Sequence, residues 1–299
     1  MKAIVTGSSG FLGKSLVRNL REDGAKVIRL VRNDFKTDST SILWDPMKGI
    51  PDTQPLENSN VVFHVAGENL ANGRWTASRK KRIRDSRVVG TKTLVDSLIK
   101  LEQPPDVLVC ASAVGIYGDR PGELVTEDSP AGEDWISKLG VEWEASASPA
   151  VEAGIRTVLL RIGVVLHPDG GMLKRILLPF KMGVGGKLGQ GTQTMSWVSL
   201  RDAIEAFRFC ADNASINGPF NVCAPERVTN AEFTLAFGKA IRRPAFLKIP
   251  SFTLKLVFGE ELSGVMLGGA SMSSAKLEST GFQFRDHDLS VTLSNMLST

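Results

Sequence analysis

The sequence predicts an α/β fold in which a doubly wound parallel sheet is followed by a smaller carboxy-terminal substrate or lid domain. Over about the first 165 residues, short apolar runs rich in β-branched residues alternate with longer amphipathic stretches. This alternation is typical of repeated βαβ units, which place helices on both faces of a parallel sheet. The alternation then gives way to glycine-rich and proline-bracketed segments, which indicate a second, less regular domain.

Six apolar runs are expected to form the strands of the sheet. They are KAIVT (2–6), KVIRLV (26–31), SILWD (41–45), VVFHVA (61–66), DVLVCAS (106–112) and TVLLRIG (157–163). Helical patterns lie between most of them, at residues 11–23, 76–101 and 134–153.

The second part of the chain has fewer clear signals. Five glycines in GVGGKLGQG (183–191) predict an irregular loop. Thr229 and Glu232 have the spacing of a capping box, so a helix is expected to begin there. We expect residues 1–225 to form the nucleotide-binding domain and residues 226–299 the small domain, with residues 165–193 contributing to the cover of the cleft.

Composition restricts the classes of partner. The net charge is +4, but the segment RKKRIRDSR (79–87) alone holds six basic residues and one acidic residue. Without it the chain has 30 basic and 31 acidic residues, so the positive charge is local and argues against a nucleic-acid partner. No run of eighteen apolar residues is present, so we expect no membrane insertion.

The expected compartment is the cytoplasm. The amino-terminal MKAIVTG enters a strand pattern at once, which leaves no room for a signal or transit peptide. Cys110, Cys210 and Cys223 lie far apart among apolar neighbours. Their number and spacing suit neither a disulfide framework nor a metal site, so we expect reduced core cysteines and no bound metal.

A glycine-rich turn, VTGSSGFLGKSL (5–16), joins the first strand to the first helix. Gly7, Gly10 and Gly13 recur at intervals of three. Glycines let the backbone approach a pyrophosphate closely, and the amides at the start of the following helix bind that anion. The turn therefore predicts a dinucleotide site on a Rossmann-type sheet.

The residue after the second strand distinguishes NAD from NADP. In LVRNDF the deciding position holds Arg32, whose guanidinium suits a ribose 2′-phosphate. Asp34, two residues later, is the alternative partner and would favour NAD. We expect NADP(H).

Further strings carry a resemblance to a known family. TGSSGFLG, VVFHVAGEN, RVVGT, SAVGIYGD and WVSLRDAIEA resemble, in order and spacing, the extended short-chain dehydrogenase/reductase superfamily. WDP (44–46), AGENLANGRW (66–75), TEDSPAGEDW (126–135) and VTNAEFTLAFGKAIRRPAF (228–246) are similar to its atypical epimerase-family branch. The resemblance spans essentially the whole chain. It implies NADP(H) binding and a small carboxy-terminal domain of unassigned role, and some relatives carry labels that refer to cell or plastid division.

The resemblance also implies which residues hold the cofactor. They are Gly7, Ser9, Gly10, Phe11, Leu12, Gly13, Arg32, Val65, Ala66, Gly67, Arg82 and Arg87. Arg87 shares one helical face with Arg79 and Ile83, because these residues are four apart. Apart from Arg82, the residues from Arg79 to Arg84 are expected to form a solvated face.

The usual proton donor of the superfamily is missing. Active relatives have a tyrosine and, four residues later, a lysine that lowers the pKa of the phenol. Aligning the family's following glutamate with Glu144 places Ile136 and Gly140 at these two positions. Lys138 is two residues from the expected lysine and would face elsewhere on the helix.

Four residues remain as catalytic candidates: Ser112, Tyr117, Glu68 and Asn69. Ser112 faces the nicotinamide in one of two registers and the opposite side of the strand in the other. Tyr117, without a cationic neighbour, is expected to keep a pKa near 10. Glu68 is a general base or a carboxylate that caps a turn, and Asn69 lies beside it at the ligand-binding edge of the sheet. His64, His167 and the tryptophans at 75, 135, 143 and 197 are expected to be structural.

Two functions stay open. The first is an NADP(H)-dependent oxidoreductase or epimerase-like enzyme that acts on a small carbonyl or hydroxyl compound, of which a nucleotide sugar is one example. The second is a regulatory or scaffold protein that holds NADP(H) without turnover. A homodimer is considered as the assembly, and the substrate is not specified by the sequence.

Overall fold

The computed structural model describes residues 1–32 and 40–297, and its centre is a seven-stranded sheet. In order across the sheet the strands are β12 (Gly218–Val222), β7 (Arg156–Ile162), β5 (Val107–Ala113), β4 (Val61–His64), β1 (Lys2–Thr6), β2 (Lys26–Val31) and β3 (Ser41–Leu43). All neighbouring pairs are parallel. The strand order reverses between β1 and β4, which is where doubly wound folds bind their ligands. The expected fold class is confirmed.

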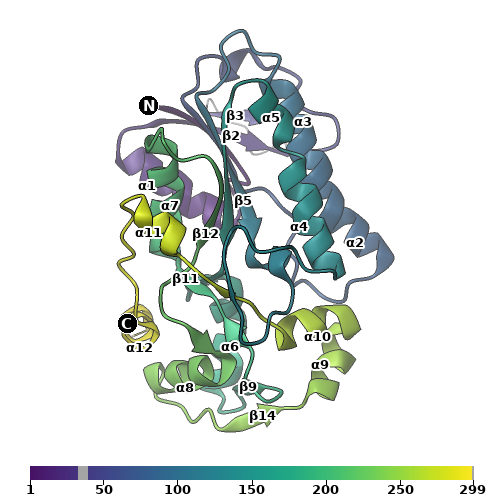
Figure 1. The fold of residues 1–299 in the computed structure, drawn as a ribbon, viewed down its shortest axis with the longest axis vertical. Coiled ribbons are helices and arrows are strands. Elements are labelled where there is room, and N and C mark those ends of the chain that lie inside the picture. The colour runs from purple at the N-terminus through teal and green to yellow at the C-terminus, as the bar shows by residue number, and fades with distance from the viewer. Residues whose placement is uncertain (33–39, 298–299) are drawn as a thin grey trace.

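Helices cover both faces of this sheet (Figure 1). On one face lie α1 (Phe11–Glu22) and α7 (Leu200–Asp212), and on the other α3 (Gly90–Leu98), α4 (Trp135–Ala145) and α5 (Ser148–Glu152). Alternate residues of a strand point to opposite faces. Accordingly, Ala3 and Val5 of β1 pack in the core with α1 and α7, whereas Ile4 packs in the core with α3 and α5. The six expected strands all form, and β12 is a seventh that the sequence pattern did not predict.

The helix expected over residues 76–101 is interrupted. Its first part is α2 (Ala77–Arg84), its last part is α3, and residues Asp85–Val89 between them form a π-helical turn. A π turn inserts one extra residue and changes the direction in which side chains point, and such turns are frequent at functional sites. Arg87 lies inside this turn.

The second domain has its own apolar core, which joins two parts of the chain. Buried residues from 166–197, such as Leu173 and Trp197, pack with residues from 224–293, such as Phe233 and Leu293. The helices of this region are α6 (Gly171–Lys181), α8 (Asn230–Ala240), α9 (Ser251–Phe258), α10 (Glu260–Leu267) and α12 (Leu289–Leu297). The short helix α11 (Ala275–Ser279) instead packs against the large sheet, where Leu277 joins the same core as Val5 and Phe207. The predicted boundary at 225/226 stays a prediction, but the core shows that residues 166–197 pack with the carboxy-terminal part of the chain.

Short strand pairs complete the structure. They are β6 (Leu124–Val125) with β15 (Ser271–Met272), β8 (Val164–His167) with β11 (Trp197–Ser199), β9 (Gly186–Leu188) with β14 (Leu247–Ile249), and β10 (Thr194–Met195) with β13 (Val228–Thr229).

The expectation of an irregular loop at 183–191 is wrong for its centre, which forms β9. Gly186 has a packing role there, because a Cβ atom on it would lie 2.3 Å from the Leu247 carbonyl oxygen. The capping box is present as expected: Thr229 Oγ1 accepts from the Glu232 amide at 3.2 Å, and the Glu232 carboxylate accepts from the Thr229 amide at 2.7 Å.

Candidate functional site

The glycine-rich turn forms a closely packed cradle at the end of β1. Gly7 has φ +63°, and a Cβ atom on it would lie 2.8 Å from the backbone of Ala66. A Cβ atom on Gly13 would lie 2.2 Å from the Gly7 carbonyl oxygen. Gly10 is the N-cap of α1 and no side chain caps that helix end. The first-turn amides of α1 are thus in the arrangement that binds a pyrophosphate in this class of fold.

The other residues of the cradle differ in exposure. Ser9 is exposed, and Leu12 is half-buried. The Phe11 ring packs against Gly170 and Gly171, where an added Cβ atom would come within 2.1 and 3.2 Å of it, respectively. The segment predicted to cover the cleft therefore contacts the cradle directly.

Arg32 lies at the same edge of the sheet. Thr6 is aligned with Leu30 across the β1–β2 pair, so Arg32, just after the end of β2, is beside the turn that starts at Gly7. Its side chain is exposed. This is the position where a dinucleotide-binding sheet recognises the adenosine ribose. Asp34, the alternative partner, lies outside the described residues.

A buried hydrogen-bond chain holds the loop after β4. Thr6 Oγ1 accepts from the amides of Val65 and Ala66, both at 3.2 Å, so its own proton is donated to His64 Nδ1 at 2.8 Å. His64 is therefore the Nε2–H tautomer, and Nε2 donates to Thr91 Oγ1 at 2.9 Å. Burial, with a smaller contribution from Arg87, lowers the pKa of His64 to about 4. The histidine is structural, as expected.

Arg87 reaches the same loop from the π turn. Its Nη1 donates to the Glu68 carbonyl at 3.0 Å, and a Cβ atom on Gly67 would lie 3.2 Å from the guanidinium carbon. The guanidinium also lies 5.1 Å from the centre of the Trp143 ring. Burial lowers the pKa of Arg87 to about 10. Arg87 thus lies beside Gly67, another residue of the predicted cofactor site, whereas Arg82 is exposed and bonds to Ser78 on its own helix.

Arg79 is not part of a solvated face, and that expectation is wrong for it. It is buried, its Nη2 donates to the Asn69 carbonyl, and its Nη1 lies 3.9 Å from the Glu68 carboxylate. Glu68 is half-buried, and its amide donates to Ser86 at 2.9 Å. Asn69 is exposed, and its side chain accepts from the Ala71 amide in a local turn. Arg79 thus contacts the carboxylate of Glu68 and the backbone of Asn69.

The small domain contacts this part of the large domain. Lys80 of α2 forms an ion pair with Glu261 of α10 at 2.7 Å. Arg74 donates to the carbonyl groups of Leu256 and Val257 at the end of α9, and Arg175 of α6 donates to the Ala71 carbonyl. These contacts join the loop after β4 to three helices of the small domain.

Apolar contacts surround the two positions of α4 that the resemblance assigns to a tyrosine and a lysine. Ile136 is buried with Ile83 and Leu139, and its Cγ1 would lie 3.2 Å from a Cβ atom on Gly115. Gly140 faces Ile116 in the 3₁₀ helix η4 (Val114–Tyr117). Apolar packing therefore occupies both positions of α4 at which the resemblance leads one to expect an ionisable pair. Lys138 is exposed, as its offset on the helix predicted.

Ser112 points into a buried polar cluster. Its hydroxyl donates to Glu144 at 2.6 Å, and the same carboxylate receives two hydrogen bonds from Arg161, at 2.9 and 2.8 Å. Ser112, Arg161 and Asn221 are aligned across β5, β7 and β12. The hydroxyl is therefore already engaged by the helix beside the strand.

Tyr117 belongs to the same cluster. It is fully buried, and its hydroxyl donates to Asn221 at 2.7 Å and accepts from Arg161 at 3.0 Å. The expectation that Tyr117 has no cationic neighbour is wrong, yet its pKa is raised, because burial outweighs the effect of Arg161. Glu127 completes the cluster by accepting from the Asn221 amide at 2.7 Å.

Sequence reasoning did not predict this cluster. Arg161 was the available signal, because an arginine inside an apolar strand pattern needs a buried acidic partner. Asn221 and Glu127 carried no comparable signal, since neither stands in a recognisable motif.

The tryptophans have separate surroundings. The rings of Trp75 and Trp135 are 4.9 Å apart and half-buried, whereas Trp143 and Trp197 are buried in apolar cores. His167 lies near Phe11, with ring centres 6.2 Å apart.

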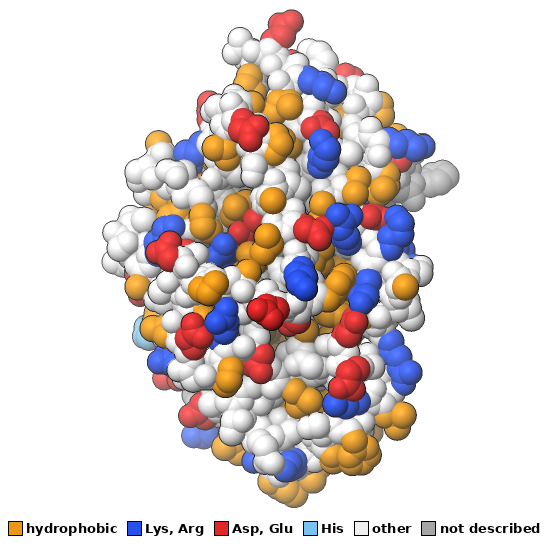
Figure 2. Space-filling view, turned by 45° about the vertical axis from the view of Figure 1, so that its right-hand side comes forward, with side chains coloured by type: hydrophobic (Ala, Val, Ile, Leu, Met, Phe, Trp, Pro, Cys, Tyr) orange, Lys and Arg blue, Asp and Glu red, His pale blue; other side chains and the backbone are white. Residues whose placement is uncertain are grey.

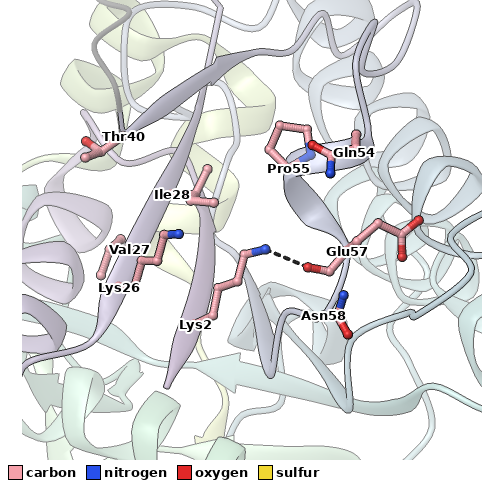
Figure 3. Close-up of a pocket in the computed structure, with 9 residues that line it drawn as sticks. All are labelled: Lys2, Lys26, Val27, Ile28, Thr40, Gln54, Pro55, Glu57 and Asn58. Carbon is pink, nitrogen blue, oxygen red and sulfur yellow. Dashed lines mark hydrogen bonds between the residues drawn. The ribbon is translucent and has the colours of Figure 1, made fainter.

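A surface cavity of about 450 Å³ lies elsewhere, at the amino-terminal ends of the strands (Figure 3). Lys2 of β1 and Lys26 of β2 line it, and Lys2 Nζ donates to the Glu57 carbonyl. Because Gly7 follows the opposite end of β1, this cavity is separate from the cradle. Within residues 1–32 and 40–297, no group of three or more His, Cys, Asp or Glu side chains is arranged to hold a metal, and none of the helices has the length and apolarity needed to cross a membrane.

The parallel sheet, its strand order and the glycine cradle define the class: a Rossmann-like α/β protein. Residues 3–223 match the NAD dependent epimerase/dehydratase family, and residues 249–296 match a domain of unknown function, DUF1731. The chain belongs to the NAD dependent epimerase/dehydratase family.

Relatives of similar length support this assignment. The chain is 39% identical over 290 residues to an epimerase family protein of Mycobacterium bovis, covering 97% of this chain and 95% of the relative. It is 33% identical over 302 residues to the epimerase family protein SDR39U1 of Bos taurus, with both chains fully covered.

Solved structures agree with this fold. The crystal structure of human epimerase family protein SDR39U1 with NADPH matches with a TM-score of 0.92 at 31% identity, over all of both chains. A nucleoside-diphosphate sugar epimerase from Corynebacterium glutamicum matches with a TM-score of 0.82 at 32% identity, over 99% of this chain and 58% of that one.

Proposed function

We propose that the protein binds NADP(H) across the carboxyl edge of its sheet and holds it without the tyrosine-dependent proton transfer of active short-chain dehydrogenases. The observation that supports NADP(H) binding most strongly is the geometry of the cradle. Gly7 and Gly13 leave no space for a Cβ atom, and no side chain caps the adjacent amino-terminal end of α1. Arg32 and Arg87 would hold the 2′-phosphate and the side of the nicotinamide half, respectively. The human relative with a TM-score of 0.92 was crystallised with NADPH, which supports the choice of cofactor.

The proposed lack of tyrosine-dependent proton transfer depends on which side chains near the cofactor site can exchange a proton. Ile136 and Gly140 cannot, and the hydroxyls of Ser112 and Tyr117 are engaged in the buried cluster around Arg161. When bound, the nicotinamide would supply only the capacity to accept or donate hydride. A regulatory or scaffold protein that reports the NADP(H) state is therefore the function we favour.

A second candidate is an NADP(H)-dependent oxidoreductase for a small carbonyl or hydroxyl compound. Glu68 favours it, because this half-buried carboxylate is the one catalytic candidate that is ionisable and not held in the buried cluster. Glu68 would act as the general base, and Asn69 would donate a hydrogen bond to the substrate. Contacts between the small domain and the loop after β4 would then enclose that substrate.

Thermal unfolding with each nucleotide tests the cofactor. NADPH should raise the melting temperature more than NADH does, and Arg32→Ala should remove the difference, because the guanidinium is the proposed partner of the 2′-phosphate. Arg18→Ala, at an exposed arginine of α1, is the matched control and should preserve it. Equal shifts from both nucleotides in the wild-type protein would refute NADP(H) selectivity.

Measuring NADPH consumption distinguishes the regulatory function from the oxidoreductase function. Under the favoured function, NADPH bound to the protein is not consumed in the presence of small aldehydes, ketones or nucleotide sugars, as followed by its absorbance. Consumption that depends on Glu68, and is lost in Glu68→Gln while NADPH binding persists, would replace the favoured function with the enzymatic one.

A further inference from the structure

The end of the small domain carries an unusual concentration of exposed apolar side chains. Two segments, 171–188 and 233–258, include α6, β9, β14, α9 and most of α8, and we call their surface the tip. Among the described residues, 17 large hydrophobic side chains are exposed, and nine of them belong to the tip. These nine are Leu178, Met182, Val184, Leu235, Phe246, Leu247, Phe252, Leu256 and Val257. Figure 2 shows hydrophobic side chains gathered at the lower end of the molecule, where Figure 1 places β9, β14 and α9.

Contacts within the tip bring its two segments together. In the β9–β14 pair, Leu247 is aligned with Gly186, and Arg243 Nε donates to the Lys181 carbonyl at 3.1 Å. The loop after α6 and the loop before β14 are therefore neighbours. On α9, Phe252 and Leu256 are four residues apart and share the exposed face. Their exposed fractions, 71% and 69%, and the 79% of Phe246 are high for side chains of this size.

The charge of the tip is entirely positive. Its two segments contain nine lysines and arginines and no aspartate or glutamate. The rest of the chain has 27 basic and 32 acidic residues, a net charge of −5. The basic residues are Lys174, Arg175, Lys181, Lys187, Lys239, Arg242, Arg243, Lys248 and Lys255, and of these Lys255 is paired with Glu260 at the border of the tip. Two properties thus coincide, exposed apolar surface and uncompensated positive charge.

The exposed apolar surface and the positive charge of the tip together favour one class of binding partner over others. A second copy of the chain, docked tip to tip about a twofold axis, would bring like charges together. A nucleic acid would use the cations but would leave the aliphatic side chains of Leu178, Met182 and Leu256 without a function. The surface of an anionic bilayer uses both, because apolar side chains enter the boundary between headgroups and acyl chains while lysine and arginine attract the anionic lipids.

We propose that the tip binds peripherally to the surface of an anionic lipid bilayer. Phe246, Phe252 and Leu256 enter the interface, and the surrounding lysines and arginines lie at the level of the lipid phosphates. No membrane-crossing helix is needed, because the apolar groups come from loops and from one face of the short helix α9. None of the residues proposed to bind NADP(H) belongs to the two segments of the tip, so the proposal does not depend on the cofactor.

Co-sedimentation of the full chain with vesicles tests this proposal. Vesicles in which about a third of the phosphatidylcholine is replaced by phosphatidylglycerol should bind the protein, and pure phosphatidylcholine should bind it far less. Raising the salt from about 0.1 M to 1 M shortens the Debye length from about 10 Å to 3 Å and should weaken binding. Equal sedimentation with both vesicle types, or none with either, would overturn the proposal.

Variants locate the binding surface. Phe246→Ser/Phe252→Ser should lower the partition coefficient about ten-fold or more. Lys174→Gln/Lys181→Gln should lower it about five-fold for each cation removed. Val151→Ser/Val291→Ser is the matched control, because these two exposed apolar residues lie outside the tip, and it should bind as the wild-type protein does. An unchanged melting temperature for each variant shows that the fold is intact.

Two other outcomes would also overturn the proposal. In sedimentation velocity without lipid, a wild-type dimer that Phe246→Ser/Phe252→Ser converts to a monomer would identify the tip as an interface between copies. Vesicle binding that persists in both tip variants would place the lipid-binding surface elsewhere on the molecule.

Discussion

Gly140 of α4 lies directly against Ile116, so that a Cβ atom at position 140 would come within 3.0 Å of the Ile116 Cβ and 3.2 Å of its Cα. The resemblance to the short-chain dehydrogenase/reductase superfamily assigns this position of the helix to its lysine. Here the close contact lets η4 pack on α4, and any side chain at position 140 would have to displace Ile116. The missing lysine is therefore a feature of the packing as well as of the chemistry.

Introducing the tyrosine and lysine of the superfamily into α4 should destabilise the protein without creating NADPH-oxidising activity. Gly140→Lys should lower the free energy of unfolding by about 1–3 kcal/mol, because the added side chain overpacks the contact with Ile116. Ile136→Tyr/Gly140→Lys should be no more active in NADPH oxidation than the wild-type protein. Urea unfolding and absorbance at the nicotinamide band provide the two measurements. A stable and active double variant would show that α4 and η4 can separate at little cost.

The glycine cradle predicts a contrast between two single substitutions. Gly13→Ala should be strongly destabilising and should abolish NADPH binding, because its Cβ atom would lie 2.2 Å from the Gly7 carbonyl oxygen. Gly264→Ala is the matched control: nothing lies within 4 Å of its added Cβ atom, and alanine favours helix α10 by up to about 1 kcal/mol. Thermal unfolding with and without NADPH measures both effects. A Gly13→Ala protein that still binds NADPH would contradict the cradle geometry.

Periodicity and glycine spacing predicted the sheet and the cradle because both depend on local sequence. β1 and α1 are read from adjacent residues, and the closeness of Gly7 to Gly13 follows from the turn that joins them. Arg87 was placed at the cofactor edge by resemblance, and its contact with Gly67 agrees with that placement.

The parts that were missed depend on contacts between distant segments. The local sequence around Gly186 predicts a loop, and only the contact with Leu247, some sixty positions later, makes Gly186 part of a strand. The burial of Arg79 depends on its contact with the loop at Asn69, which a one-dimensional charge pattern does not show. The local sequence around Ser112 and Tyr117 does not show the partners of their hydroxyl groups, because those partners, Glu144, Asn221 and Arg161, come from distant segments.

The buried ion pair between Arg161 and Glu144 should be costly to break. The side chains are 10% and 11% exposed, and Arg161 binds both carboxylate oxygens. Glu144→Leu leaves the guanidinium without its charge partner and should lower the free energy of unfolding by about 3–5 kcal/mol. Arg161→Met/Glu144→Leu removes both charges and should recover part of that loss, as measured by urea unfolding. Equal losses in the single and double variants would mean that the pair acts through packing alone.

His64 predicts how stability depends on pH. Its pKa is lowered from 6.5 to about 4, mainly by burial and to a smaller extent by the charge of Arg87. The neutral ring accepts from Thr6 and donates to Thr91. Above pH 6.5 the ring is neutral in both the folded and the unfolded chain, so this contribution to stability is fully present. Below pH 6.5 the unfolded chain takes up a proton that the folded chain does not, and stability falls until about pH 4. A shift of this size corresponds to about 3 kcal/mol in the free energy of unfolding.

In His64→Gln this part of the pH dependence should be missing. The difference in the free energy of unfolding between variant and wild type should therefore shrink as the pH falls from 6.5 to 4. A difference that stays constant over this range would show that His64 titrates normally in the folded protein.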